Sequence, residues 1–534
     1  MFSRLLRRWT RRAPARAKPR SKTTTLRVEP LEDRSLLSVT LFAAGDRGGT
    51  PPSNIELWKT DATTAGTVLV KNINATGPTA SSDPLDITYV PQLNKWFFSA
   101  DDGVHGREPW VSDGTTAGTR MIKDLFVQGS VASYSSLDRN FAPFFTYCNG
   151  YVYFAANGGP AQGGLELWRT NGTAGNATLV KDINHLAAAS EPAKLTALGN
   201  ALYYVADDGL HGRELWVTTP TGSHMVRDIL PDGQRSSTPR SLTAVGNKLF
   251  FVATDLRYGE ELWVTQGTSA TTLRIDIYRG PSNAYSSAPD WLTNYNGKCY
   301  FAAEDGVHGR ELWVSDGTVP GTKMVKDVNG RRYDPTFDMY FNPDSNPANL
   351  TVMGNRLYFS TLEVSPDVPS RIFPNCSRLF KTDGTAAGTV LIKQINSYPY
   401  DSAEPTAIHL EPARFTVVGN LLFFSAGTHY DAVSATNENV ELWRSDGTTA
   451  GTYQVRDIFP YNYGSSKPSK LRAINGKLVF FAYSEQYGRE LWVSNGSAAG
   501  TTLLKNINTT YSAPYGQGSE SYGFAYDGYL WDNT

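Results

Sequence analysis

Short stretches in which apolar and polar residues alternate recur along the whole chain. In "ELWVS", residues 311 to 315, a period of two places Glu, Trp and Ser on one face and Leu and Val on the other. Both faces carry bulky apolar side chains, as expected when a sheet is packed between two neighbouring sheets. Little in the sequence has the period of a long amphipathic helix. The pattern predicts an all-β protein of short strands.

The strands group into units of four. In residues 241 to 277 the segments "SLTAV" and "KLFFVA" flank the pair Gly246-Asn247, which suits a two-residue hairpin. The segments "ELWVT" and "TTLRIDI" follow and flank a Gly-containing turn. In other units this turn has the form DGTxxGT, where Asp can hydrogen-bond the following backbone and Gly relieves strain. Each unit therefore predicts a four-stranded antiparallel sheet.

The unit occurs nine times, with a spacing of 47 to 67 residues between equivalent aromatic residues. A period near fifty is found in propeller blades. We expect a β-propeller, with nine blades as the first reading and an eight-bladed ring with one displaced unit as the alternative. The aromatic positions are Trp58, Trp110, Trp168, Trp216, Trp263, Trp313, Phe380, Trp443 and Trp492.

The two ends of the repeat region complement one another. The first unit starts at "VTLFAAGD", a second-strand pattern, whereas "GFAYDGYLW", residues 523 to 531, begins a further unit. We expect C-terminal strands to complete the first blade and to close the ring, since closure removes exposed sheet edges. Residues 39 to 534 then form a single propeller domain.

The N-terminal segment differs in charge from the rest of the chain. Residues 1 to 27 hold ten Lys or Arg and no acidic residue, which leaves 40 basic against 51 acidic residues in the remainder. We expect residues 1 to 38 to be a disordered basic arm or part of an export-type signal. The acidic body argues against nucleic-acid binding, and no run of eighteen apolar residues predicts a transmembrane helix.

The sequence nominates neither a cofactor nor a metal. Cys148, Cys299 and Cys376 occupy unrelated positions in the repeats, so they predict no disulfide framework and no metal knuckle. No EF-hand loop, HExxH, GxSxG or phosphate-binding glycine loop is present. We therefore expect no cofactor and no bound metal, and the sequence identifies no catalytic residue.

The segments "ELWVSDGTVPGTKMVKDV" and "ELWRSDGTTAGTYQVRDI" resemble the ELWxxDGT repeat family of bacterial secreted or surface proteins over about residues 39 to 531. The stretch "RVEPLEDRSLLS", residues 27 to 38, resembles the LEPRxLL-type N-terminal motif of large exported planctomycete proteins, with Asp33 where that motif has Pro. These resemblances imply a secreted or cell-surface protein. They imply no particular activity.

Three units carry a sharper motif before the third strand, "DDGVHGREPW", "DDGLHGRELW" and "EDGVHGRELW". Asp, His and Arg in one turn could form a metal or anion site. Two other units have Tyr258 or Tyr487 in place of the His, which favours a packing role for a flat ring instead. The candidates are Asp102, His105, Arg107, Asp208, His211, Arg213, Asp305, His308 and Arg310.

The Glu of ELW recurs in eight units. Two carboxylates over one substrate could do acid and base work, but eight equivalent copies favour a structural role. Pairing with the preceding Arg, or with a neighbouring blade, is the interpretation we prefer. These residues are Glu56, Glu108, Glu166, Glu214, Glu261, Glu311, Glu441 and Glu490.

Extra length falls in three segments that we expect to be loops on one face of the disc, residues 330 to 347, 361 to 377 and 426 to 440. Loops on a rigid scaffold often carry recognition. We expect a monomeric, non-enzymatic propeller that binds a protein or a carbohydrate there; the alternative is a hydrolase or lyase with a site at the central axis. The candidate binding residues are Arg331, Arg332, Tyr333, Phe337, Tyr340, Arg371, Phe373, His429, Tyr430 and Asp431.

Overall fold

The computed structural model describes most of the repeat region. The described residues are 38–47, 53–125, 145–159, 163–185, 189–231, 233, 235–279, 285–334, 339–364, 374–395, 412–431, 436–460 and 464–507. They belong to one compact unit, Leu37–Thr534. All of the expected arm at residues 1 to 38 except Ser38, and the expected closing strands at residues 523 to 531, lie outside the described residues.

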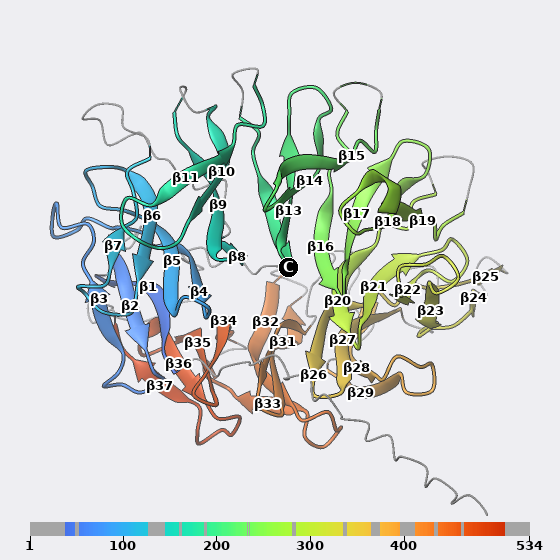
Figure 1. The fold of residues 1–534 in the computed structure, drawn as a ribbon. Coiled ribbons are helices and arrows are strands. Elements are labelled where there is room, and N and C mark those ends of the chain that lie inside the picture. The colour runs from blue at the N-terminus through green and yellow to red at the C-terminus, as the bar shows by residue number, and fades with distance from the viewer. Residues whose placement is uncertain are drawn as a thin grey trace, which may run out of the picture. The chain divides into compact units, whose positions relative to one another are not determined.

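Nine antiparallel sheets form the blades of a β-propeller, as Figure 1 shows. The nine-bladed reading of the sequence is confirmed, and the eight-bladed alternative is wrong. Eight blades have four strands in sequence order, and blade 1 has three described strands. The described residues contain one short 3-10 helix, η2 (Ser269–Thr271), in the last turn of blade 5.

The blades have the following strands. Blade 1 has β1 (Thr40–Arg47), β2 (Ser53–Thr60) and β3 (Val68–Lys71); blade 2 has β4 (Leu85–Val90), β5 (Lys95–Asp101), β6 (Arg107–Ser112) and β7 (Arg120–Met121); blade 3 has β8 (Thr146–Cys148), β9 (Tyr151–Asn157), β10 (Leu165–Thr170) and β11 (Ala177–Lys181). Blade 4 has β12 (Ala193–Leu198), β13 (Ala201–Asp207), β14 (Arg213–Thr219) and β15 (Gly222–Arg227); blade 5 has β16 (Arg240–Val245), β17 (Lys248–Asp255), β18 (Gly259–Thr265) and β19 (Leu273–Ile275); blade 6 has β20 (Asp290–Tyr295), β21 (Lys298–Glu304), β22 (Arg310–Ser315) and β23 (Lys323–Lys326). Blade 7 has β26 (Ala348–Met353), β27 (Arg356–Val364), β28 (Pro374–Thr382) and β29 (Val390–Gln394); blade 8 has β30 (Ala413–Val418), β31 (Leu421–Asp431), β32 (Thr436–Ser445) and β33 (Tyr453–Arg456); blade 9 has β34 (Ser469–Ile474), β35 (Lys477–Ser484), β36 (Gly488–Ser494) and β37 (Thr502–Lys505).

The hairpins between first and second strands follow the expected turn chemistry. Asn149 and Gly150 both have positive φ, 47° and 86°, as a type I′ turn requires. Where the order is reversed, Gly246 has φ 60° and the following Asn247 is not among the positive-φ residues, as in a type II′ turn. Both orders of the pair thus set the two-residue register between the strands.

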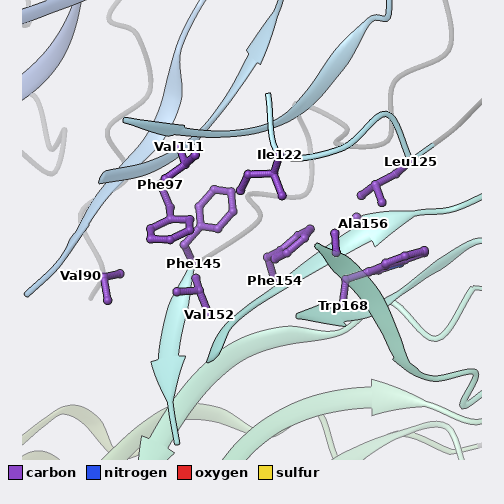
Figure 2. Close-up of a cluster of buried hydrophobic side chains, with 11 residues drawn as sticks. Val90, Phe97, Val111, Ile122, Leu125, Phe145, Val152, Phe154, Ala156 and Trp168 are labelled. Atoms are coloured by element: carbon purple, nitrogen blue, oxygen red, sulfur yellow. The ribbon is translucent and has the colours of Figure 1, made fainter. Parts of the chain in front are cut away.

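The core lies between the blades. The ELW Leu, which blade 2 replaces by Pro109, is buried against the next blade, and the Trp, which blade 7 replaces by Phe380, packs against the preceding one. Between blades 4 and 5, for example, Leu215 packs with Phe251 and Trp263. Figure 2 shows the same arrangement between blades 2 and 3, where Phe97 and Val111 face Phe154 and Trp168. The two apolar faces expected from the sequence are confirmed.

Nine such clusters occur, one at each junction between consecutive blades. The ninth joins blade 9 to blade 1 and contains Phe42, Val479 and Leu491. Thr64 of blade 1 donates to the Leu504 carbonyl at 2.9 Å, and the Asn475 amide donates to the Asp61 carbonyl at 2.9 Å. The ring is therefore closed by packing between the described parts of its first and last blades.

The first strands are the innermost. From β8 to β34 each first strand contacts the first strand of the next blade, and Figure 1 shows these strands around the centre of the ring. Because strands alternate in direction, the turns between second and third strands and the crossovers between blades lie at the same end of the strands. We call this end the crossover face.

The three long insertions lie on the crossover face, but their described parts are strands rather than loops. Residues 330 to 347 contain the hairpin of β24 (Arg332–Asp334) and β25 (Met339–Phe341). The other two insertions lengthen β27 and β28, which pair out to Val364 and Pro374, and β31 and β32, which pair out to Asp431 and Thr436. The expectation of irregular loops was wrong here, because the added residues continue the antiparallel ladder.

Candidate functional site

The ELW Glu fixes each crossover. In blade 4 the Glu214 carboxylate accepts the backbone N–H of Ile229 at 3.3 Å, and both the N–H and the hydroxyl of Ser237, at 3.0 and 2.6 Å. The Ser237 carbonyl in turn accepts the N–H of Thr254 in blade 5, at 2.9 Å. The pair therefore ties the end of one blade to the second strand of the next, and we call it a Glu–Ser latch.

The latch is repeated around the ring. Glu56, Glu166, Glu261, Glu311 and Glu441 bind Ser82, Ser190, Ser287, Ser345 and Ser466 in the same way. Blade 7 has Arg378 instead of Glu. Of the two pairings that we preferred for these Glu residues, pairing with the preceding Arg is wrong in these six blades, because the carboxylates bind backbone amides and Ser hydroxyls. The Ser lies at the crossover into the neighbouring blade, in line with the second pairing. The signal in the sequence is a Ser-x-Pro triplet, as in Ser237-Thr238-Pro239, before the first strand that follows each of these six blades.

The latch carboxylates are buried, with an exposed fraction of 2% or less. Burial raises the pKa of Glu214 to about 7 and that of Glu311 to about 8, against the hydrogen bonds from Ser237 and Ser345, which lower it. The pKa values of Glu166, Glu261 and Glu441 rise to about 7 for the same reason. These groups titrate near neutral pH.

Just after seven of the crossovers, the first strand contains a bulge with a left-handed residue. In blade 5, Arg240 pairs with Val252 and Thr243 with Phe250, so the first strand has one extra residue, and Ser241 has φ 53°. In six of these seven blades a Thr stands two residues later, and its hydroxyl donates to the carbonyl of the left-handed residue, in blade 5 at 3.0 Å. We call the seven such positions the inner rim: Asp86, Lys194, Ser241, Trp291, Asn349, Arg414 and Lys470.

The inner rim combines a constant backbone with variable side chains. The seven φ values lie between 53° and 59°, yet the side chains include one carboxylate, three cations, an indole, an amide and a hydroxyl. A left-handed conformation costs a non-Gly residue about 1 to 2 kcal/mol, and strained residues gather at functional sites. Neither the inner rim nor its bulge was expected from the sequence, since these positions share no side-chain type.

Asp86 is the carboxylate of the inner rim. Burial raises the pKa of Asp86 to about 6, while the positive charge of Arg107 opposes that rise. A carboxylate with a pKa near neutrality can act as a general base or acid. Arg107, one of the candidate residues from the sequence, therefore lowers the pKa of Asp86 through its positive charge.

The Asp–His–Arg motifs close their own turns. The Asp102 carboxylate accepts the N–H of Val104 and of His105 at 2.9 and 2.8 Å, and its second oxygen lies 2.7 Å from His105 Nδ1. Asp208 with His211, and Asp305 with His308, repeat these contacts. The hydrogen bond to Asp raises the pKa of His105 and of His211.

The Arg of this motif supports the inner rim. Arg107 donates to the Asp83 carbonyl at 2.8 Å, Arg213 to the Glu191 carbonyl at 3.0 Å, and Arg310 to the Ala288 carbonyl at 2.7 Å. Each of these carbonyls lies three residues before an inner-rim residue. The motif is therefore a structural clamp on the strand that carries the inner rim, and among the described residues no group of three or more His, Cys, Asp or Glu could hold a metal ion.

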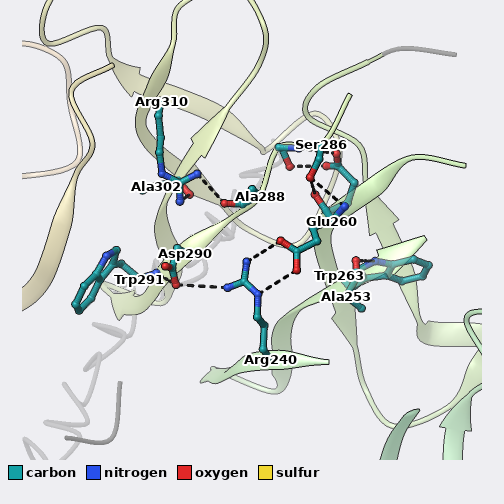
Figure 3. Close-up of polar contacts among 12 residues, drawn as sticks. Arg240, Ala253, Glu260, Trp263, Ser286, Ala288, Asp290, Trp291, Ala302 and Arg310 are labelled. Carbon is teal, nitrogen blue, oxygen red and sulfur yellow. Dashed lines mark hydrogen bonds and ion pairs between the residues drawn. The ribbon is translucent and has the colours of Figure 1, made fainter. Parts of the chain in front are cut away.

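Blade 5 replaces the clamp by an ion-pair network, drawn in Figure 3. Glu260 stands where the other motif has Arg, and it accepts Arg240 Nη2 at 3.0 Å. Arg240 also reaches Asp290 of blade 6, at 3.5 Å. Tyr258, in the slot of the His, lies against the Arg274 guanidinium, whose carbon is 3.2 Å from the ring centroid. The ion pairs of Arg240 thus link β16 and β20, the first strands of two consecutive blades.

The expected binding residues lie in three separate insertions. The guanidinium carbon of Arg331 lies 4.5 Å from the ring centroid of Tyr340, and the ring centroids of Tyr340 and Tyr333 are 5.1 Å apart. The β24–β25 hairpin therefore brings these three residues together. Arg332 lies in β24. His429, Tyr430 and Asp431 lie in the extension of β31. Phe337, Arg371 and Phe373 lie outside the described residues.

Two further features bear on chemistry and location. Cys148 and Cys299 are buried free thiols, and burial raises both pKa values, which disfavours the thiolate. Among the helices of the described residues, none is long and apolar enough to cross a membrane.

Comparisons with known proteins bear on the fold. No family model and no curated protein matches the chain. Among solved structures, a puromycin hydrolase mutant complexed with PGG is 13% identical with a TM-score of 0.36, over 78% of this chain and 59% of that one. A prolyl endopeptidase is 10% identical with a TM-score of 0.39, over 77% and 54%. The propeller domain of the Trilobed protease from Pyrococcus furiosus is 11% identical with a TM-score of 0.31, over 58% and 84%.

The chain spans 54 to 61% of the length of the puromycin hydrolases and the prolyl endopeptidase. These chains are hydrolases and peptidases, so our main expectation of a non-enzymatic binding propeller is contradicted by this comparison. The hydrolase alternative accords with it better.

Proposed function

We propose that this protein is a propeller hydrolase that acts on peptides, with its site at the inner rim on the crossover face. The observation that carries the proposal is the inner rim itself. Seven blades hold a strained residue in the same backbone conformation on the innermost strand, while the side chain differs from blade to blade. Scaffold positions of the repeat, such as the ELW Glu and the ELW Leu, keep their side chains in eight of the nine blades. Variation of the side chain at a constant backbone position is typical of contact with a ligand.

The substrate class is taken from the similar solved structures, which include a prolyl endopeptidase and a puromycin hydrolase. The inner rim offers groups that suit a peptide. Lys194 and Arg414 are exposed cations that could bind carboxylates, and Ser241 and Asn349 can hydrogen-bond a peptide backbone.

The test incubates the purified full chain with a panel of fluorogenic peptides, some of which contain proline. Hydrolysis is followed by fluorescence, and the products are identified by mass spectrometry. We expect cleavage that falls at least tenfold when Lys194, Ser241 and Arg414 are all changed to Asn, the residue that blade 7 has at this position. The matched control changes Asn200, Asn247 and Asn420, exposed hairpin residues at the other end of the strands, to Ser. Absence of cleavage across the panel, or an equal loss in the control, would contradict the proposal.

A further inference from the structure

We propose that Asp86 is the catalytic general base of this site and that it activates a water molecule for attack on a peptide carbonyl. The inference rests on the proposed function. It starts from the inner rim, where Asp86 is the one carboxylate among the seven left-handed positions.

Several elements hold the Asp86 backbone. The Glu56–Ser82 latch fixes the crossover four residues before it, with the Ser82 hydroxyl 2.6 Å from the carboxylate of Glu56. Arg107 clamps the Asp83 carbonyl, and Thr88 donates to the Asp86 carbonyl at 3.0 Å. A catalytic group gains from such support, because acid–base chemistry depends on a fixed donor–acceptor geometry.

Arg107 differs from its counterparts in burial. Its exposed fraction is 4%, and its guanidinium also reaches the Ser99 carbonyl and hydroxyl of the adjoining strand β5, at 3.3 and 3.2 Å. Its positive charge favours the carboxylate form of Asp86, while burial disfavours it, and the pKa of Asp86 settles at about 6. Asp86 is therefore mostly ionised at pH 7 and can still accept a proton during a reaction.

The reaction is balanced without a cofactor. The Asp86 carboxylate takes one proton from water while the water oxygen bonds to the carbonyl carbon of the substrate. The tetrahedral intermediate then breaks its carbon–nitrogen bond, and Asp86 returns the proton to the leaving nitrogen. The products are a carboxylic acid and an amine. Arg107 acts as a positioning residue, since it holds the backbone and the charge state of Asp86.

The experiment compares Asp86→Asn with Asp113→Asn in the full chain. Asn is well tolerated in the left-handed conformation, and blade 7 already has Asn349 at the position of Asp86. Asp113 is exposed in a turn at the other end of the strands, where blade 3 has Asn171 with the same Thr contacts, so both variants are expected to fold. We expect Asp86→Asn to lower kcat/KM at least about 100-fold, and Asp113→Asn to change it less than threefold. The wild-type profile of kcat against pH should rise through an apparent pKa of about 6, and this limb should vanish in Asp86→Asn.

A second measurement does not depend on turnover. In protein with ¹³C-labelled aspartate, one carboxyl resonance should titrate near pH 6 and be absent from Asp86→Asn. Wild-type cleavage that persists in Asp86→Asn would overturn this inference and leave the proposed function standing. Wild-type protein that cleaves nothing in the panel would overturn the proposed function and this inference together.

Discussion

At the scale of single residues, the most informative contact is the one between the ELW Glu and the crossover Ser. A buried carboxylate is costly unless donors surround it, and here two backbone amides and one hydroxyl supply those donors. Blade 7, where Arg378 replaces the Glu, also lacks a Ser-x-Pro triplet before its following strand β30, which Leu410, Glu411 and Pro412 precede. The six latches have both residues and blade 7 lacks both, whereas blade 2 keeps Glu108 although Phe141, Ala142 and Pro143, without a Ser, precede β8.

Glu214→Ala tests the latch. The change leaves the N–H of Ile229 and the N–H and hydroxyl of Ser237 without their acceptor in a buried place, and each such group costs about 1 to 3 kcal/mol. We expect urea denaturation to show a loss of about 3 kcal/mol or more, and Ser237→Ala to lose about 1 kcal/mol. Glu485→Ala, at an exposed residue, is the control. A Glu214→Ala protein as stable as this control would show that the latch contributes nothing.

At the scale of the element, a Lys at the end of the outer strand ties several blades to the next one. Lys181 at the end of β11 donates to the Ser223 carbonyl of blade 4 at 3.1 Å, and its Nζ lies 5.3 Å from the Trp216 ring centroid. Lys71, Lys123 and Lys393 make the same pair of contacts with the following blade. A blade is therefore secured on the inside by the latch and on the outside by this cation.

Lys181→Met removes the outer tie and keeps most of the aliphatic stem. A hydrogen bond from a charged donor and a cation–π contact are lost, and together they are worth about 1 to 3 kcal/mol. We expect urea unfolding to show a loss in that range. Lys323→Met, at an exposed residue on an outer strand, should change stability by no more than about 0.5 kcal/mol. Equal losses in the two variants would argue against a specific tie.

At the scale of the whole molecule, the repeated latch makes stability depend on pH. Burial raises the folded-state pKa of Glu166, Glu214, Glu261 and Glu441 to about 7, and that of Glu311 to about 8, from 4.5. Between pH 4.5 and 8 the folded state therefore binds more protons than the unfolded state, and its stability falls as pH rises. The raised pKa values of His105 and His211 act in the same direction.

We expect the melting temperature to be higher at pH 5.5 than at pH 8.5. Below about pH 4 the trend should reverse, because Asp113, Asp316 and Asp446 have lowered pKa values, chiefly through hydrogen bonds from Thr side chains, and lose that contribution on protonation. Thermal melts across this range provide the measurement. Changing Glu166, Glu214, Glu261 and Glu311 to Gln should flatten the slope between pH 5.5 and 8.5. A slope that survives in this variant would rule out the latches as its source.

Closure by the C-terminus stays a prediction, because residues 508 to 534 lie outside the described residues. Blade 1 has three described strands and begins with a second-strand pattern. We expect deletion of residues 519 to 534 to lower the melting temperature sharply, since it would remove the first strand of blade 1. Deletion of residues 1 to 34, which lack an alternating apolar pattern, should leave it unchanged. Identical melting curves for the two deletions would contradict closure by these residues.

The sequence alone determined the architecture. Period-two patterning, the Gly-Asn and Asn-Gly pairs and the repeated ELW segment are local signals, and local backbone geometry and burial on two faces follow from them directly. Nine units predicted nine blades, and the Leu and Trp of ELW predicted two packed faces. The sequence also identified the turn motif that contains His105, but it did not predict that the Arg of this motif clamps the strand that carries the inner rim.

Tertiary structure decided the site. Ser237 and Glu214 are 23 residues apart, and only the crossover brings them together, so neither residue predicts the other by spacing along a strand. The inner rim has no shared side-chain type, because its common property is a backbone conformation imposed by the bulge between first and second strands. Whether Asp86 is a surface carboxylate or a tuned base depends on burial and on the positive charge of Arg107, which lies in another strand. These properties arise from the closed ring and are absent from any one repeat.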